Sequence, residues 1–114
     1  MHIEDLQKLC KQLPHVTEDI KWGHDLCFCI GEKMFLVTGL GESPAKASFK
    51  ADDEDFAELC AREGFIPAPY LARHKWVHVD NISRLSEKEW KTYIGKAYHL
   101  IKSKLPKKVL DKLK

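Results

Sequence analysis

This sequence of 114 residues has no long apolar segment, only six glycines and four cysteines, and no familiar catalytic motif. No apolar run approaches the roughly 20 residues that a membrane-spanning helix requires, which excludes such a helix. No CxxC, HExxH or glycine-framed serine is present. The glycines of the segment 39–41 lie between predicted strands, so they do not form a phosphate-cradling loop that leads into a helix. We therefore expect no enzyme activity and no cofactor.

Two residue pairs could suggest a metal or catalytic centre. Cys27 and Cys29 would lie on one face of a strand, and His74 and His78 have the spacing of a helical zinc site. The cysteines alternate with apolar residues, however, and the histidines fall on a predicted loop and strand. We predict buried thiols and no metal site. A ligand-binding or enzymatic role around His74, His78 and a cysteine remains a third hypothesis.

The composition is that of a soluble globular domain. Apolar residues make up 44% of the chain, charged residues 32% and aromatic residues 10%. This length suits one domain, which we expect to span residues 1–114. The first ten residues are charged and amphipathic, unlike a signal peptide, so we expect a cytoplasmic protein with reduced thiols.

The two halves of the chain differ in charge. Residues 1–63 contain 7 Lys and Arg against 13 Asp and Glu, a net charge of −6, whereas residues 64–114 contain 12 against 4, a net charge of +8. Such asymmetry is typical of proteins with an anionic partner such as nucleic acid. The alternative is that the two halves interleave in space and their charges mix.

Hydrophobic periodicity predicts three helices and four main strands. The helices are expected at residues 3–13, 53–63 and 86–104, and the strands at 26–30, 34–40, 46–50 and 76–80, with room for short strands at 18–22 and 66–70. Asp52 is a predicted N-cap, and Ser86 with Glu89 forms a predicted capping box. The third helix carries a buried stripe that includes Trp90, Ile94 and Tyr98. Pro106 should end it.

The order α-β-β-β-α-β-α favours an α+β fold, a two-layer sandwich with a largely antiparallel sheet. The strands at 26–30 and 34–40 should form a hairpin. Each helix has one apolar stripe, so all should pack on the same face of the sheet. A basic tail should begin at about residue 106, and it would either grip phosphates or be a solvated, frayed terminus.

This architecture leaves one face of the sheet open. In the strand 46–50, Ala47 and Phe49 alternate with a polar set of Lys46, Ser48 and Lys50. In the strand 76–80, Val77 and Val79 suit the core. Trp76, His78 and Asp80 should then point to the open face. An error of one residue in the register would exchange the two faces.

Basic and aromatic residues are concentrated in the segment 66–80, IPAPYLARHKWVHVD. Lysine and arginine can contact phosphates, and aromatic rings can stack on bases. The bland alternative is that the rings are core residues and the charges are solvated. The predicted nucleic-acid-binding residues are Lys33 (at the tip of the hairpin), Lys46, Lys50, Tyr70, Arg73, His74, Lys75 and Trp76.

Several motifs resemble the MmcQ/YjbR family of small bacterial proteins. In family order they are LPHVTED, WGHD, GEKMFLV, SFKADDE, PAPYLARHKWVHVD and YHLIKSKLPKK. The resemblance implies the YjbR-like fold, also called double wing, which is related to secretion-chaperone-like folds. It also implies a DNA-binding role and supplies no catalytic residues.

Our leading hypothesis is a non-enzymatic protein that binds nucleic acid, DNA in the first instance, through the phosphate backbone. The alternative is a protein- or peptide-binding adaptor that uses the open sheet face or a strand edge. We expect a monomer or a weak homodimer and no membrane partner.

Overall fold

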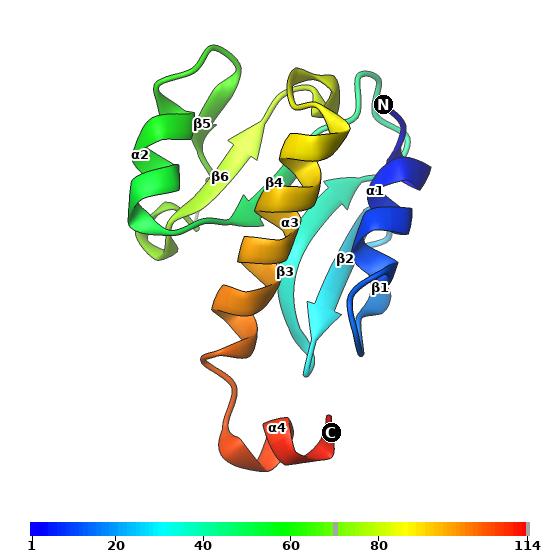
Figure 1. Ribbon diagram of the computed structural model, residues 1–114. Coiled ribbons are helices and arrows are strands. Elements are labelled where there is room, and N and C mark those ends of the chain that lie inside the picture. Colours follow the sequence, from blue (N-terminus) through cyan, green and yellow to red (C-terminus); the bar gives the residue numbers. More distant parts are fainter. Residues whose placement is uncertain (70, 114) are drawn as a thin grey trace.

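The computed structural model describes residues 1–69 and 71–113 (Figure 1). The helices are α1 (Ile3–Lys11), α2 (Asp53–Cys60), α3 (Glu87–Lys102) and α4 (Lys107–Lys112). The strands are β1 (Thr17–Lys21), β2 (Asp25–Ile30), β3 (Lys33–Gly39), β4 (Ala47–Lys50), β5 (Phe65–Pro67) and β6 (Trp76–Val79). Two short 3₁₀ turns are η1 (Ala72–His74) and η2 (Ile82–Arg84).

All six strands form one sheet in the order β1-β2-β3-β4-β6-β5, and every neighbouring pair is antiparallel. The predicted α+β class and the antiparallel sheet are therefore confirmed. Short strands do occur near the expected positions 18–22 and 66–70, as β1 and β5, although β5 already ends at Pro67; they form the two edges of the sheet. Among the described residues, no helix is long and apolar enough to cross a bilayer.

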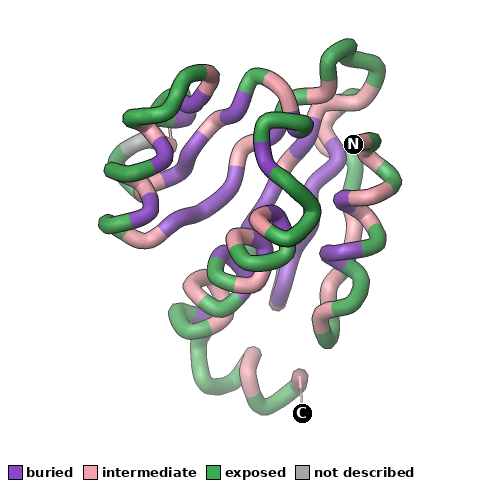
Figure 2. The backbone as a smooth tube through the Cα atoms, turned by 45° about the horizontal axis from the view of Figure 1, so that its top comes forward, coloured by how far each residue is buried: buried purple, intermediate pink, exposed green. Residues whose placement is uncertain are grey.

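The helices α1, α2 and α3 lie on one face of the sheet, with α3 running across its middle (Figures 1 and 2). Buried residues concentrate where the sheet meets these helices (Figure 2). Trp90 is fully buried at the centre, and its indole Nε1 donates a hydrogen bond of 2.7 Å to the Ile82 carbonyl. Tyr98 packs edge-on against Phe35, at 5.8 Å between ring centroids. The predicted buried stripe of α3 is thus confirmed.

A β-bulge adapts β3 to this core. Phe28 pairs with Leu36, but the next residue of β2, Cys29, pairs with Met34. Phe35 is therefore an extra residue on β3. As a result, Phe35 and Leu36 are both fully buried in the core, although they are neighbours on a strand, and Met34 is turned toward the other face.

The predicted helix starts are confirmed by their hydrogen bonds. The Asp52 side chain accepts from the Asp55 amide at 2.7 Å, and Ser86 and Glu89 form the reciprocal bonds of a capping box. The helix ends were placed too late: α2 ends at Cys60 and α3 at Lys102. In α2 the backbone leaves the helix before Gly64, whose φ of 87° suits the turn into β5.

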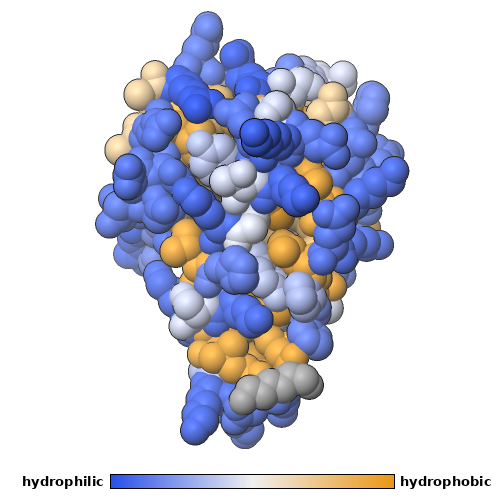
Figure 3. Space-filling model, in the orientation of Figure 1, coloured by the Kyte–Doolittle hydropathy of each residue, from blue (hydrophilic) through white to orange (hydrophobic). Residues whose placement is uncertain are grey.

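The C-terminal segment is partly folded, while Lys107, Lys108 and Lys112 remain exposed to solvent, as the solvated alternative expected. It forms α4, whose residues Val109 and Leu110 pack against the core. The contact is close, because a Cβ at Gly31, in the turn between β2 and β3, would lie only 2.9 Å from a Val109 methyl group. Figure 3 shows hydrophobic surface at this lower end of the molecule, around the end of α3 and α4.

Candidate functional site

The pairing of β4 with β6 sets the geometry of the candidate site. Lys50 lies opposite Trp76, and Ser48 lies opposite His78. Val77 and Val79 belong to the core, as predicted. The prediction that the segments 46–50 and 76–80 share a sheet is therefore confirmed, and strand alternation places Trp76 and His78 on the opposite side of β6 from the two valines.

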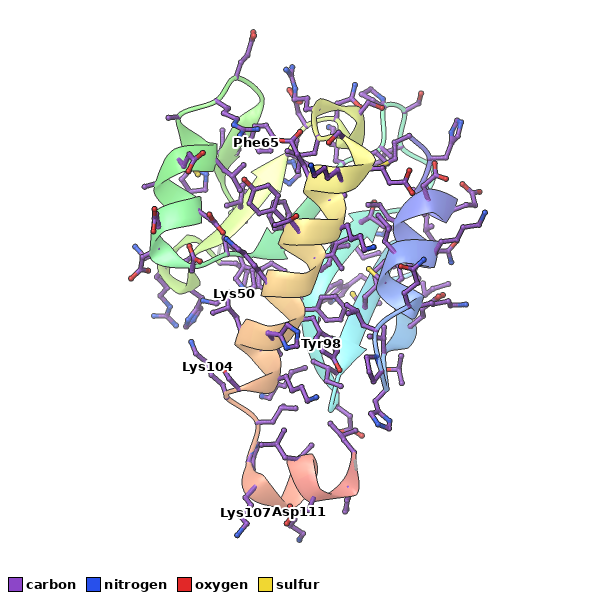
Figure 4. The ribbon with its side chains drawn as sticks, viewed as in Figure 1. Lys50, Phe65, Tyr98, Lys104, Lys107 and Asp111 are labelled. Carbon is purple, nitrogen blue, oxygen red and sulfur yellow. The ribbon has the colours of Figure 1, made fainter. Side chains whose placement is uncertain are left out.

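At one end of these strands lies a pocket of about 490 Å³, which we call the basic pocket. It forms where the start of β3, the end of β4, the segment before β6 and the last turn of α3 converge. Its lining residues are Lys33, Met34, Lys50, Leu71, His74, Trp76, Ile101, Lys104 and Leu105. Figure 4 shows two of them, Lys50 and Lys104, beside the lower half of α3. The described lining contains three lysines and no carboxylate.

Lys50 is the unusual residue of this pocket. It was expected on the water-facing side of its strand, and that expectation is wrong, because only 7% of its surface is exposed. Its Nζ donates a hydrogen bond to the backbone carbonyl of His74. Within the described part of the chain, no carboxylate oxygen lies within 4.0 Å of this ammonium group. A buried cation that lacks an acidic partner is costly.

The electrostatic environment reflects this cost. Burial lowers the pKa of Lys50 below its ordinary value, and the positive charges of Lys104 and Lys75 lower it further. Asp53 acts in the opposite direction. Two other acids near the start of α2 are engaged elsewhere: Asp55 accepts from Lys96 at 2.9 Å, and Asp52 caps the helix. An anion in the pocket would offset the excess positive charge.

Trp76 forms a wall of the pocket. It lies on the opposite side of β6 from Val77, yet its exposed fraction is only 5%. The expectation of an exposed ring on an open face is thus wrong. The segment before β6 and the end of α3 line the pocket beside this ring through Leu71, Ile101 and Leu105. Trp76 can offer an apolar contact but no freely exposed stacking platform.

The other predicted nucleic-acid-binding residues near the pocket differ in where their side chains lie. Arg73 is exposed on η1, next to the pocket-lining His74. Lys75 turns toward α2, where its Nζ lies 5.1 Å from the centre of the Phe56 ring. Tyr70 lies outside the described residues. Lys33 lines the pocket from the start of β3, where the hairpin-tip prediction had placed it.

Lys46 does not belong to this site. It precedes β4, at the opposite end from Lys50, is exposed, and has its Nζ 3.9 Å from Glu42 Oε2. It lines a different hollow, which we call the mixed-charge pocket, together with Asp25, Val37, Gly39, Glu42, Ala47, Ser48 and His78. In that pocket the Ser48 hydroxyl and His78 Nδ1 form a hydrogen bond of 2.9 Å. Burial and the charge of Lys46 lower the pKa of His78.

Sequence reasoning missed Lys104 and the aliphatic residues that line the basic pocket. Lys104 was expected only as the last residue of the predicted helix 86–104, and nothing local indicates that the chain after α3 lies beside the end of β4. Among the described residues, no three His, Cys, Asp or Glu cluster as metal ligands. Burial raises the pKa of Cys10 to about 12 and that of Cys27 to about 11, so these thiols are poorly suited to act as nucleophiles.

Comparison with known proteins places this architecture in a family. The structure resembles the crystal structure of the Deinococcus radiodurans protein DR2400, which carries a DUF419 domain, with a TM-score of 0.86 and 24% identity over 97% of this chain and 86% of that one. It also resembles a Pseudomonas syringae protein, with a TM-score of 0.71 and 16% identity over 88% of this chain and 98% of that one. At these identities the likeness concerns the fold. No significant match to a curated protein was found. A model of the YjbR family matches residues 11–100, and the chain therefore belongs to the YjbR family.

Proposed function

We propose that the protein binds nucleic acid, with DNA as the leading candidate, through contacts between the phosphate backbone and the lysines of the basic pocket. The observation that carries the proposal is Lys50, a buried cation without a described carboxylate within 4.0 Å. Natural proteins seldom keep such a charge unless it is compensated, and a phosphate would supply the compensation.

The surroundings support an anionic partner of extended shape. Lys33 and Lys104 flank Lys50 in the pocket, and Arg73 is exposed nearby on η1. The C-terminal segment adds Lys107, which Figure 4 shows beyond Lys104 at the lower end of the molecule. The basic second half of the chain thus contributes several cations at the same end. The DNA-binding role implied by the resemblance agrees with this distribution.

The test is a fluorescence-anisotropy titration of labelled duplex and single-stranded DNA at several salt concentrations. Contacts from about three lysines should make the logarithm of the association constant fall linearly with that of salt, with a slope of about −2 to −3. Absence of binding at low salt would contradict the proposal. Affinity that is independent of salt would contradict it as well.

A second candidate function, a protein-binding adaptor, draws on a different region. The edge strand β1 and the turn after it expose two large apolar residues, Ile20 at 57% and Trp22 at 70%. An edge strand with apolar side chains can pair with a partner segment. A complex with one polypeptide that resists nuclease treatment and is lost on Trp22→Ala would favour this function over DNA binding.

A further inference from the structure

The basic pocket is more apolar than contacts with a phosphate backbone require. Beside its cations it presents Met34, Leu71, Trp76, Ile101 and Leu105. Its volume of about 490 Å³ lies within the range of small-molecule sites. Lysines that only follow a duplex backbone can stand on a flat or convex surface. A concave, largely apolar site with cations is suited to a ligand that has both an anionic group and an apolar body.

The cations approach the pocket from three separate elements. Lys33 comes from the start of β3, Lys50 from the end of β4, and Lys104 from the chain just after α3. Lys50 is held in place by its burial and by its hydrogen bond to the His74 carbonyl. A group bound between these side chains would be contacted from several sides, as a phosphate monoester with several acceptor oxygens requires.

We infer that the basic pocket binds one nucleoside monophosphate unit, with the phosphate among Lys33, Lys50 and Lys104 and the base against the apolar wall that includes Trp76. This inference rests on the proposed function and deepens it, since it names the part of a nucleic acid that enters the pocket. Bases in a duplex are stacked and paired, whereas those of a single strand can unstack and pack on apolar or aromatic side chains. The unit can be a free nucleotide or the phosphorylated end of a single strand.

The three tryptophans of the chain make a direct test possible. Trp76 lines the pocket, Trp22 is exposed in the turn after β1, and Trp90 is fully buried in the core. Each indole N–H gives its own signal in a ¹H–¹⁵N NMR spectrum. We expect deoxyadenosine monophosphate to shift the Trp76 indole signal in a saturable manner and to leave those of Trp22 and Trp90 in place. A short single strand with a 5′-phosphate, compared with the same strand without it, distinguishes a strand end from a free nucleotide.

Two comparisons decide the chemistry of the ligand. Inorganic phosphate and hexyl phosphate should each bind more weakly than deoxyadenosine monophosphate by about tenfold, because neither brings a base. Equal affinity for inorganic phosphate would overturn the inference and leave a simple anion site. Equal affinity for hexyl phosphate would also overturn it, in favour of an aliphatic phosphate. A shift at Trp22, or none at Trp76, would overturn it outright.

Variants separate the site from general charge effects. Lys50→Met should weaken nucleotide binding by about tenfold or more, since it removes a charge-assisted contact. Lys104→Gln changes an exposed side chain, so it should fold normally, and it should also weaken binding severalfold. Lys46→Gln, at the other end of β4, is the matched control and should bind as the unaltered protein does. Wild-type affinity in both Lys50→Met and Lys104→Gln would exclude the pocket.

The inference and the proposed function can fail separately. If nucleotide bound at Trp76 but DNA showed no salt-dependent binding, the proposed function would be contradicted and the nucleotide pocket would be supported. If DNA bound in a salt-dependent manner but Trp76 responded neither to a nucleotide nor to a phosphorylated strand end, the proposed function would be supported and the nucleotide pocket would be contradicted.

Discussion

The two ends of β4 carry lysines in contrasting surroundings. Lys46 is exposed, lies 3.9 Å from Glu42, and shares its hollow with Asp25. Lys50, four residues further along and on the same face, is 7% exposed, and its described pocket contains no carboxylate. Lys46 is electrostatically balanced by local acids, whereas Lys50 is not.

The difference comes from what covers each end of the strand. The turn before Lys46 belongs to the same stretch of chain and brings Glu42 with it. The other end is covered by η1 and by the chain that follows α3, both distant in sequence, and they bring His74 and Lys104. Tertiary packing therefore converts one of two similar lysines into a desolvated cation. This contrast supports the proposal that the basic pocket binds an anion.

Giving Lys50 an acidic neighbour should make the basic pocket resemble the mixed-charge pocket. In Lys104→Glu we expect the free energy of unfolding to rise by about 0.5–1 kcal/mol, because an exposed side chain that repels Lys50 is replaced by one that attracts it. We expect DNA affinity to fall at the same time. Urea denaturation and anisotropy titration measure the two effects.

Lys108→Glu is the control for Lys104→Glu, because it changes net charge equally at an exposed position outside the pocket lining. It should lower DNA affinity less and leave stability nearly unchanged. If both variants lost the same DNA affinity and changed equally in stability, net charge alone would explain the result. The location of Lys104 in the basic pocket would then have no effect of its own.

The mixed-charge pocket should instead respond to acid through His78. Burial and Lys46 lower its folded-state pKa, while Glu42 and Asp80 oppose the shift. The unfolded chain therefore binds the proton more readily, and stability is lost as pH falls from about 6.5 through the folded pKa. His78→Gln, which retains a hydrogen-bonding group near Ser48, should reduce this loss of stability, because glutamine does not titrate.

Thermal unfolding of the unaltered protein and of His78→Gln between about pH 7 and pH 5 measures the effect. As the pH is lowered, the unaltered protein should lose more stability than His78→Gln does. If the difference in stability between the two proteins stayed constant over this pH range, the pKa of His78 would be the same in the folded and unfolded states.

Much of the fold could be predicted because its signals are local. Alternation in the strands 46–50 and 76–80 placed Val77 and Val79 in the core, and the capping box at Ser86 marked the start of α3. The bulge at Phe35 and the helix α4 could not be predicted. The first depends on how two strands fit a shared core, and the second on apolar contacts with a turn about 75 residues earlier in the chain.

The site was predicted only in part for the same reason. Lys33, Lys50, His74 and Trp76 were selected from the sequence, and the fold brings them together. Strand alternation placed Lys50 and Trp76 on the correct side of their strands, opposite the core residues. It wrongly predicted that they are exposed, because alternation says nothing of what covers the end of a strand. Lys104 had no pattern of its own.

The most direct test compares DNA affinity in Lys50→Met and Lys46→Met, two variants with the same chemical change at opposite ends of β4. We predict that Lys50→Met loses about tenfold or more in affinity and that its salt slope falls by about one, while Lys46→Met stays within about twofold of the unaltered protein. Urea denaturation of both variants would show that they are folded at the binding temperature. Equal losses in the two variants, or a larger loss in Lys46→Met, would contradict the assignment of DNA binding to the basic pocket.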